Sequence, residues 1–245
     1  GAAGLISSCF RALNGDEVLL IEKNEKLGKK LYVTGKGRCN VTNDCDAEDF
    51  LKNVVTNPRF LTGAAHRFPP RKFKEWLSGK VPLKTERGGR VFPVSDKSSD
   101  IIRALESYAR EAGVKILLNE KVLSLDVSDG KITGVTTDKE RIVCDAAIVC
   151  TGGKSYPATG SDGDGYRFAE RAGHTVVPPK PALTGINLKG DLYKSLQGLT
   201  LKNVSLTVFS GGKKIYSDFG EMMFTHFGVS GPIVLSASSY LNKTD

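Results

Sequence analysis

The opening Gly1-Ala2-Ala3-Gly4 and the acidic Glu22 have the residue types and the spacing of a dinucleotide-binding site. Small residues let a peptide backbone approach a pyrophosphate, and the amino terminus of a following helix adds partial positive charge. A carboxylate roughly 20 residues beyond the glycines accepts hydrogen bonds from ribose hydroxyls. Because GxxG also occurs by chance, an ordinary tight turn before a helix explains Gly1 to Gly4 equally well.

A second candidate is the basic, glycine-rich segment 28–43, which directly follows the acidic residue. Backbone N–H groups of such a loop can face a phosphate, and Lys30 and Arg38 can add charge-assisted contacts. Alternatively, Gly35 and Gly37 only close turns and the lysines are solvated. The position of the loop just after Glu22 favours the phosphate-facing role.

A third candidate is Thr151-Gly152-Gly153, which follows the apolar run 146–150. At the carboxyl edge of a parallel sheet, such a turn brings backbone against a bound cofactor. Further upstream, the strand that starts near Val122 can lay a backbone amide against an adenine. The three candidates occur in the order that a dinucleotide site requires.

The elements that must position these residues follow an α/β pattern. We expect apolar strands that are buried on both faces, helices between them, and a small antiparallel meander of three alternating runs. The predicted helices are 4–15, parts of 47–79, 97–111 and 165–172. The predicted strands are 17–21, parts of 81–94, 114–118, 122–127, 132–137, 141–144 and 146–150.

The proline-rich stretch 178–181 marks a change in composition. Residues 1–183 are predicted to form a Rossmann-like nucleotide-binding domain. Several strand-like runs lie between Gly185 and Phe224, so residues 184–245 are predicted to begin a second, β-rich domain.

Composition narrows the classes of partner. The 245-residue chain has a formal net charge of +8, which favours anionic partners. Its lysines and arginines are spread out, with a mild concentration from Arg67 to Arg90, so a solvated basic surface is favoured and nucleic acid is an unlikely partner. The five cysteines form no CxxC pair and no zinc-like pattern, which indicates a reducing, cytoplasmic setting without a metal site. No apolar run approaches the roughly 18 to 20 residues of a membrane helix.

Five segments together make the chain similar to a known family: GAAG, EKNEKLGKKLYVTGKGRCNVTN, RVFPVSDKSSD, TGGKSYPATGSDGDGY and GEMMFTHFGVSGP. They resemble the BaiN/RdsA (YhiN-like) family of NAD(P)/FAD-dependent oxidoreductases over essentially the whole chain. The resemblance implies FAD bound in a glutathione-reductase-type fold, an inserted substrate domain, and NAD(P)H as electron donor without a redox-active dithiol. It assigns the cofactor contacts to Gly1, Ala3, Gly4, Glu22, Lys23, Lys30, Gly37, Arg38, Cys39, Asn40, Val122, Thr151, Gly152 and Gly153.

Two departures from the family pattern concern the ends of the chain. The strand before Gly1 and the first glycine of the fingerprint are missing, and so is the closing segment that covers the flavin. We therefore expect these 245 residues alone to hold FAD poorly.

Candidates for the chemistry itself are fewer. Flavin supplies the hydride chemistry, so the protein mainly positions the substrate and tunes charge near the ring. Ser155, Tyr156, Asp164 and the Thr225-His226 pair are the candidates. For Tyr156 and Asp164 a turn-stabilising hydrogen bond is the favoured alternative, and for His226 a packed or capping role is equally compatible with the sequence. Cys39 has no partner cysteine nearby and is expected to pack within its loop.

The sequence therefore predicts an FAD-dependent oxidoreductase, specifically an NAD(P)H-dependent reductase of a small organic substrate. A flavin-dependent oxidase and a flavoprotein that acts on nucleic acid, like those that modify tRNA, are the alternatives. Nucleotide binding without turnover is a third. The oligomeric state stays open.

Overall fold

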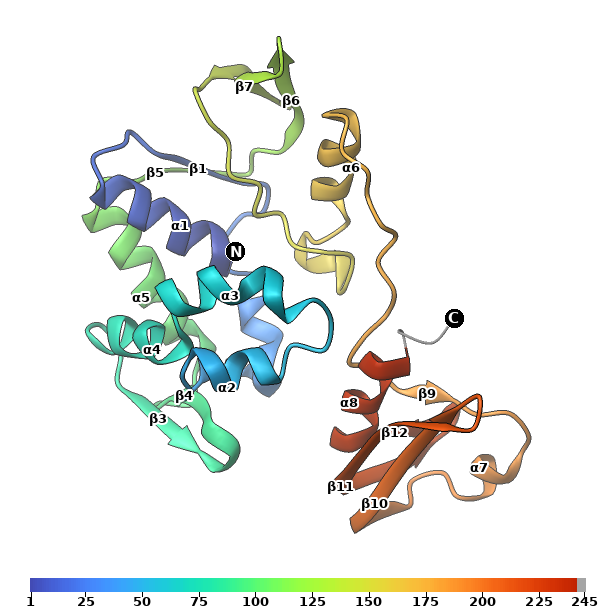
Figure 1. Ribbon diagram of the computed structural model, residues 1–245. Coiled ribbons are helices and arrows are strands. Elements are labelled where there is room, and N and C mark those ends of the chain that lie inside the picture. Colours follow the sequence, from blue (N-terminus) through green and yellow to red (C-terminus); the bar gives the residue numbers. More distant parts are fainter. Residues whose placement is uncertain (242–245) are drawn as a thin grey trace. The chain divides into compact units, whose positions relative to one another are not determined.

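A computed structural model describes residues 1–241 of the chain. It divides the chain into two compact units, Gly1–Val176 and Val177–Asp245, which we call unit 1 and unit 2 (Figure 1). The division at Val176 precedes the domain boundary predicted after residue 183.

The core of unit 1 is a parallel pair of strands, β1 (Leu19–Glu22) and β5 (Lys115–Leu118), in the register Leu19 to Lys115 and Glu22 to Leu118. Helices α1 (Ala2–Leu13) and α5 (Ser98–Glu111) pack against each other and against this pair (Figure 1). Leu5 of α1 and Ile101 and Leu105 of α5 are almost fully buried. This helix-strand arrangement confirms the predicted α/β, Rossmann-type fold.

The chain between β1 and α5 builds a helical insertion followed by a small sheet. The 3-10 segment η1 (Leu31–Gly37) leads to β2 (Thr42–Asn43), α2 (Ala47–Lys52), α3 (Pro58–Arg67) and α4 (Pro70–Ser78). Strands β3 (Leu83–Glu86) and β4 (Arg90–Pro93), joined by η2 (Arg87–Gly89), pair antiparallel, and the sheet order is β2-β4-β3. Both helices that start at Pro58 and Pro70 place proline where no intrahelical N–H is needed.

Aromatic side chains attach this insertion to the core. Phe10 of α1 contacts Phe68 and Trp76, with ring centroids 5.4 and 5.3 Å apart. Trp76 also stacks on Tyr108 of α5 at 4.2 Å, and the Tyr108 hydroxyl donates to the Trp76 carbonyl oxygen over 2.8 Å. Such ring pairs stabilise a fold by about 0.5–1.5 kcal/mol each, in addition to the contribution from the apolar area that they bury.

The predicted meander is confirmed: β6 (Val122–Ser128), β7 (Lys131–Thr137) and β8 (Arg141–Val143) form an antiparallel sheet in chain order. After it come η3 (Pro157–Thr159) and α6 (Asp164–Arg171). The predicted strand 146–150 is wrong, because within residues 1–241 this stretch has no hydrogen-bonded partner strand. Ile148 and Val149 are 60% and 44% exposed, so the apolar run identified by its composition is not buried here.

Unit 2 contains one antiparallel sheet of order β10-β11-β12-β9 and a helix that packs on it. The helix contributes Ile233 and Val234 to a small core with Val229. The elements are β9 (Ile186–Asn187), α7 (Leu192–Ser195), β10 (Thr200–Ser210), β11 (Lys213–Thr225), β12 (Gly228–Ser230) and α8 (Pro232–Leu241).

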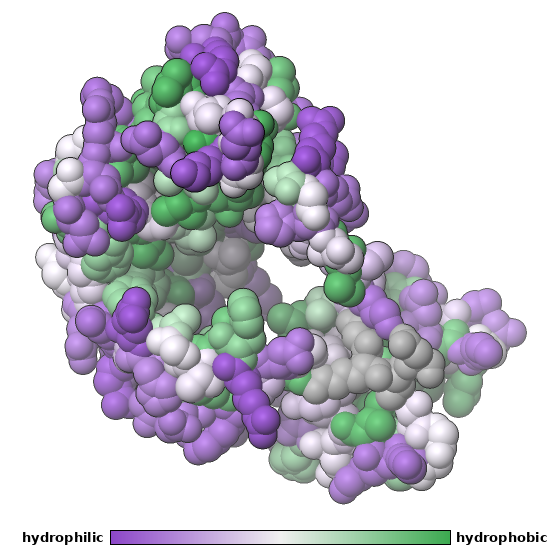
Figure 2. Space-filling model, turned by 45° about the horizontal axis from the view of Figure 1, so that its top comes forward, coloured by the Kyte–Doolittle hydropathy of each residue, from purple (hydrophilic) through white to green (hydrophobic). Residues whose placement is uncertain are grey.

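On the face shown in Figure 2, polar residues predominate and apolar residues appear in groups between them. Over residues 1–241, no helix has both the length and the apolar composition that crossing a membrane requires. The same residues contain no cluster of three or more His, Cys, Asp or Glu side chains suited to a metal ion.

Candidate functional site

Glu22 lies at the carboxyl end of β1, beside the amino terminus of α1. Its side chain is only 13% exposed, and Oε2 is 3.5 Å from the Gly1 nitrogen. Oε1 accepts hydrogen bonds from the backbone N–H and the side-chain amide of Asn24, at 3.0 and 2.7 Å. The two parts of the predicted dinucleotide motif, the glycines and the acid, are therefore together at one edge of the sheet.

The first turn of α1 has free hydrogen-bond donors. Gly1 is the N-cap without a side-chain cap, and among residues 1–241 the N–H groups of Ala2, Ala3 and Gly4 have no partner. A Cβ on Gly4 would lie 3.3 Å from Leu20 Cδ1 and 3.4 Å from Cys150 Cβ. Because Gly4 lacks that atom, the helix start can approach β1 and residues 146–150 closely.

Two loops distant in sequence close over this edge. Lys23 Nζ donates to Asp164 Oδ2 at 2.8 Å and to Asp162 Oδ1 at 3.0 Å. Lys30 Nζ donates to the Ser155 carbonyl oxygen at 2.7 Å. The loop after β1 and the segment after Thr151 are thus tied together by Lys23 and Lys30, two residues that were predicted to contact the cofactor and that here donate to protein groups.

Ion pairing at this junction shifts the pKa values of Lys23 and Asp162. Burial acts to lower the pKa of Lys23, but its hydrogen bonds to Asp164 and Asp162 outweigh burial and raise it. At Asp162 burial acts to raise the pKa, but the hydrogen bond from Lys23 outweighs it, and the pKa is lowered to about 2. Asp164 has a side chain only 7% exposed and also pairs with Arg167. Burial lowers the pKa of Lys30. These ion pairs tie the loop after β1 to the segment that contains Asp162 and Asp164.

The glycine-rich loop 35–40 has a compact, largely left-handed backbone. Gly35, Lys36, Gly37 and Cys39 all have positive φ, and a Cβ on Gly35 would lie 2.8 Å from the Asn40 nitrogen. Cys39 is 2% exposed, and burial raises its thiol pKa, which suits the packing role expected for it. The loop therefore offers tightly turned backbone rather than a reactive thiol.

Arg38, in the same loop, is already engaged by protein groups. Its guanidinium donates to Asp96 Oδ1 at 2.8 Å and to Glu86, and it lies 4.1 Å from the centroid of the Phe92 ring. These carboxylates raise the pKa of Arg38. In this arrangement the side chain fastens the loop to β3 and to the turn after β4, so the Arg38 guanidinium is not free for a phosphate.

The remaining predicted cofactor residues lie near the same edge. Gly152 has φ +76°, and a Cβ there would lie 2.6 Å from Ser161 Oγ, so the Thr151-Gly152-Gly153 turn requires glycine. Val122 begins β6, just after Glu120, whose N–H donates to the Glu22 carbonyl oxygen at 3.2 Å. The sequence reasoning missed Asn24, although its place two residues after the acid was a usable signal.

The candidates for catalysis are divided between the two units. Tyr156 is 71% exposed with φ +51°, and Asp164 is engaged by Lys23 and Arg167. Thr225 and His226 belong to unit 2, where His226 is exposed. The Thr225 Oγ1 is buried without a hydrogen-bond partner among residues 1–241.

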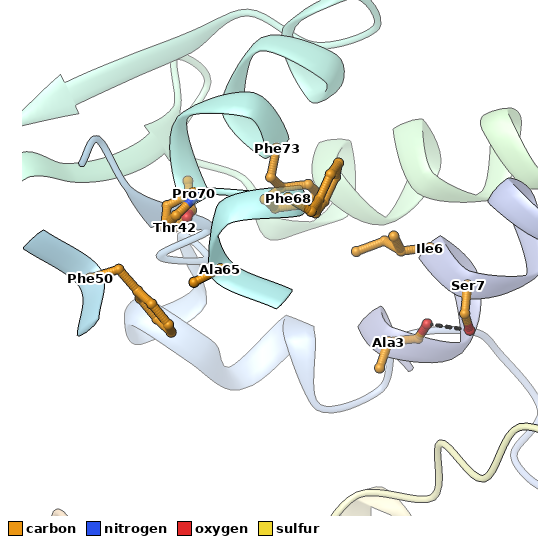
Figure 3. Close-up of a pocket in the computed structure, with 9 residues that line it drawn as sticks. All are labelled: Ala3, Ile6, Ser7, Thr42, Phe50, Ala65, Phe68, Pro70 and Phe73. Carbon is orange, nitrogen blue, oxygen red and sulfur yellow. Dashed lines mark hydrogen bonds between the residues drawn. The ribbon is translucent and has the colours of Figure 1, made fainter. Parts of the chain in front are cut away.

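A pocket of about 390 Å³ adjoins the first turns of α1 (Figure 3). Phe50 of α2, Phe68 and Phe73 line one side of it, and Ile6 and Ala3 of α1 line the other. Thr42 and Ser7 are its polar residues, and Ala65 and Pro70 complete the lining. The sequence reasoning missed this pocket, because helical periodicity in 47–79 does not reveal which faces converge.

The family model for the HI0933-like protein Rossmann domain matches residues 1–231 of this chain. The chain belongs to this HI0933-like family. The resemblance stated from the sequence motifs is thereby confirmed.

Characterised relatives of this HI0933-like chain carry two kinds of activity. The present chain is 31% identical over 245 residues to a 3-dehydro-bile acid delta(4,6)-reductase of Clostridium scindens, and the match covers 99% of this chain and 59% of that relative. It is also 31% identical over 244 residues to the ribosomal RNA dihydrouridine synthase of Escherichia coli, covering 98% and 59%. The chain therefore spans somewhat more than half the length of these relatives.

Among solved structures, a flavocytochrome c3 fumarate reductase in its open conformation is similar, with a TM-score of 0.55 and 18% identity. The match covers 82% of this chain and 44% of that one. At this identity the likeness supports the fold alone, and it agrees with the Rossmann-type core of unit 1.

Proposed function

We propose that this chain is the nucleotide-binding part of an FAD-dependent reductase that takes its electrons from NAD(P)H. The observation that carries the proposal is the meeting of three features at the carboxyl edge of β1 and β5: the free amides of α1, Glu22, and the loop 151–164. Membership of the HI0933-like family supports the same conclusion.

The residues present fit an FAD molecule. The uncapped first turn of α1 and the absence of a Cβ at Gly4 leave donors and space for a pyrophosphate. Glu22, with a mostly buried carboxylate, would accept hydrogen bonds from the ribose hydroxyls. The backbone of Gly37 to Asn40 and of Thr151 to Gly153 would complete the contacts, while Arg38 holds its loop in place.

When bound, FAD supplies hydride transfer between donor and substrate. The chain's own residues bind and orient the two molecules. The lysine-carboxylate junction fixes the loop 151–164 over the site, so that backbone groups do not have to reorganise. The pocket lined by Phe50, Phe68 and Phe73 would receive the apolar part of a substrate and keep water away from it.

The reductase direction and the electron donor are proposals drawn from the relatives. The names of both kinds of relative describe the addition of hydrogen to an organic substrate, a bile acid in one case and uridine of ribosomal RNA in the other. We infer that the present chain serves the same kind of reaction on an unsaturated substrate. A pocket of about 390 Å³ lies within the size range of pockets that bury small organic molecules.

Reduction of a base in RNA is a second candidate for the substrate. It is favoured by 31% and 30% identity to ribosomal RNA dihydrouridine synthases of Escherichia coli and Haemophilus influenzae, over 98% and 100% of the chain. The net charge of +8 agrees with a polyanionic substrate.

The test is anaerobic reduction of the flavin in the complete protein, followed by visible absorbance. The proposal expects bound FAD to be bleached by NADH or NADPH and to be reoxidised by an unsaturated acceptor. Bound FAD that neither nucleotide bleaches, but that an organic substrate bleaches and that oxygen reoxidises once it is admitted, would instead identify an oxidase. Protein that takes up no FAD would refute the flavoprotein proposal altogether.

A further inference from the structure

Although lysines and arginines are spread along the chain, almost all of its net positive charge comes from one region of unit 1. Residues 58–90, which form α3, α4, β3, η2 and β4, contain nine Lys and Arg but only two acids, a net charge of +7. The formal charge of the whole chain is +8, so the other residues nearly balance. We call this part of unit 1 the basic region. In Figure 1 its elements lie together, at the end of unit 1 away from the β6–β7 meander.

Some bases of this region stabilise the fold and others do not. Lys74, Lys80 and Lys84 each place Nζ 2.6 Å from a carboxylate oxygen, of Asp44, Glu111 and Asp96 respectively. Four other bases are exposed and have no carboxylate partner among residues 1–241. They are Arg59 and Arg67 of α3, Lys72 of α4, and Arg87 of η2.

An ordinary solvated helix surface pairs its charges within the helix. On α5, for example, Arg103 and Arg110 pair with Asp100 and Glu106 one turn away. Helix α3 contains no acidic residue at all. The charges of the four unpaired bases are therefore not neutralised locally, and unneutralised positive charge on a folded surface attracts polyanions.

An exposed aromatic side chain accompanies these charges. Phe60 is 88% exposed and lies next to Arg59, and its spacing of seven residues from Arg67 puts both on one side of α3. Aromatic rings beside arginines are a usual surface for unpaired nucleic-acid bases, which stack on the ring while the arginines contact phosphates. Phe60 is the one large hydrophobic residue of the basic region that the structure exposes, whereas membrane-binding helices present a whole apolar face.

We propose that the basic region is a docking surface for single-stranded RNA. The inference rests on the RNA-substrate form of the proposed function and identifies which part of the chain would hold that substrate. Arg59, Arg67, Lys72 and Arg87 contact phosphates, and Phe60 stacks on a base.

The test uses the complete protein and a short, fluorescein-labelled, uridine-containing RNA, with anisotropy measured over a series of salt concentrations. One variant neutralises the four unpaired bases of the basic region. It carries Arg59→Gln, Arg67→Gln, Lys72→Gln and Arg87→Gln. A matched control variant neutralises four exposed lysines outside the region, also without carboxylate partners among residues 1–241. It carries Lys131→Gln, Lys202→Gln, Lys213→Gln and Lys214→Gln.

Wild type is expected to bind RNA with strong salt dependence. In the first variant, the slope of log K against log salt should fall by about 3, since each lost phosphate contact on a single strand accounts for about 0.7. The control variant should keep most of the affinity, and Phe60→Ala should weaken binding without changing the slope. Equal losses in the two charge variants, or wild-type protein that binds anionic vesicles but not RNA, would overturn the proposal.

Flavin content and its bleaching by NAD(P)H, measured on the same proteins, separate this inference from the proposed function. A reducible flavoprotein that does not bind RNA refutes only the docking surface. An RNA-binding protein without flavin refutes only the reductase.

Discussion

The junction between Lys23 and the loop 151–164 allows a paired test of how burial sets the strength of an ion pair. Asp164 and Asp162 accept hydrogen bonds from the same amine, at 2.8 and 3.0 Å. Their side chains differ in exposure, 7% for Asp164 and 39% for Asp162. Because both accept from Lys23, either carboxylate can be removed while Lys23 keeps one partner. Asp164 also pairs with Arg167.

Asp164→Asn should destabilise the protein by about 2 kcal/mol. A hydrogen bond to a charged group contributes about 1.5–3 kcal/mol, and losing a partner in a buried pair costs up to about 5, but the 21% and 48% exposure of Lys23 and Arg167 reduces that cost. Asp162→Asn, the matched control, should cost about 0–1 kcal/mol: the lowered pKa of Asp162 would imply more, but its 39% exposed carboxylate is screened by solvent.

The assay is urea unfolding of both variants in the complete protein, followed by circular dichroism, with constant m-values required for the comparison. Combining each substitution with Lys23→Met in a double-mutant cycle isolates the coupling to Lys23. A larger loss for Asp162→Asn than for Asp164→Asn would refute the argument that burial decides the strength of these pairs.

Three further outcomes are expected at the same site. Glu22→Gln should weaken FAD binding about 10- to 100-fold in a fluorescence titration, because a charge-assisted hydrogen bond is worth about 1.5–3 kcal/mol, while Glu17→Gln, at an 83% exposed side chain, should leave binding unchanged. Ala65→Phe should fill the pocket and raise KM for an apolar substrate about tenfold in steady-state kinetics, whereas Ala64→Phe, at the exposed neighbour, should not. Because the pKa of Asp162 is lowered from 3.8 to about 2, its contribution to stability is complete above about pH 4 and is lost as the pH falls toward 2, which carboxyl NMR titration and acid unfolding can measure. An unshifted Asp162 titration would contradict the hydrogen bonds described for it.

The sequence predicted an element or a site residue correctly where residues close together in the chain determine it. The glycine start of α1, the apolar β1 and the acid at its end are specified by residues close in the chain, and the structure has them as helix, parallel strand and mostly buried carboxylate. The meander could also be predicted, because runs of alternating apolar and polar residues, separated by turns such as Ser128-Asp129-Gly130, specify β-hairpins.

The sequence failed where structure depends on distant partners. Residues 146–150 have strand composition, but a strand exists only where a neighbour pairs with it. Arg38 looked available for phosphate because its partners Glu86 and Asp96 are 48 and 58 residues away. The pocket of Figure 3 depends on faces of α1 to α4 that converge only in the folded protein.

The most direct test of the central claim is a comparison of FAD with FMN. If Glu22 and the first turn of α1 bind the adenosine diphosphate half of the cofactor, the complete protein should take up FAD in a 1:1 ratio and leave FMN in solution. Isothermal titration calorimetry and visible absorbance after desalting both report this difference. Equal retention of FMN and FAD, or retention of neither, would contradict the account.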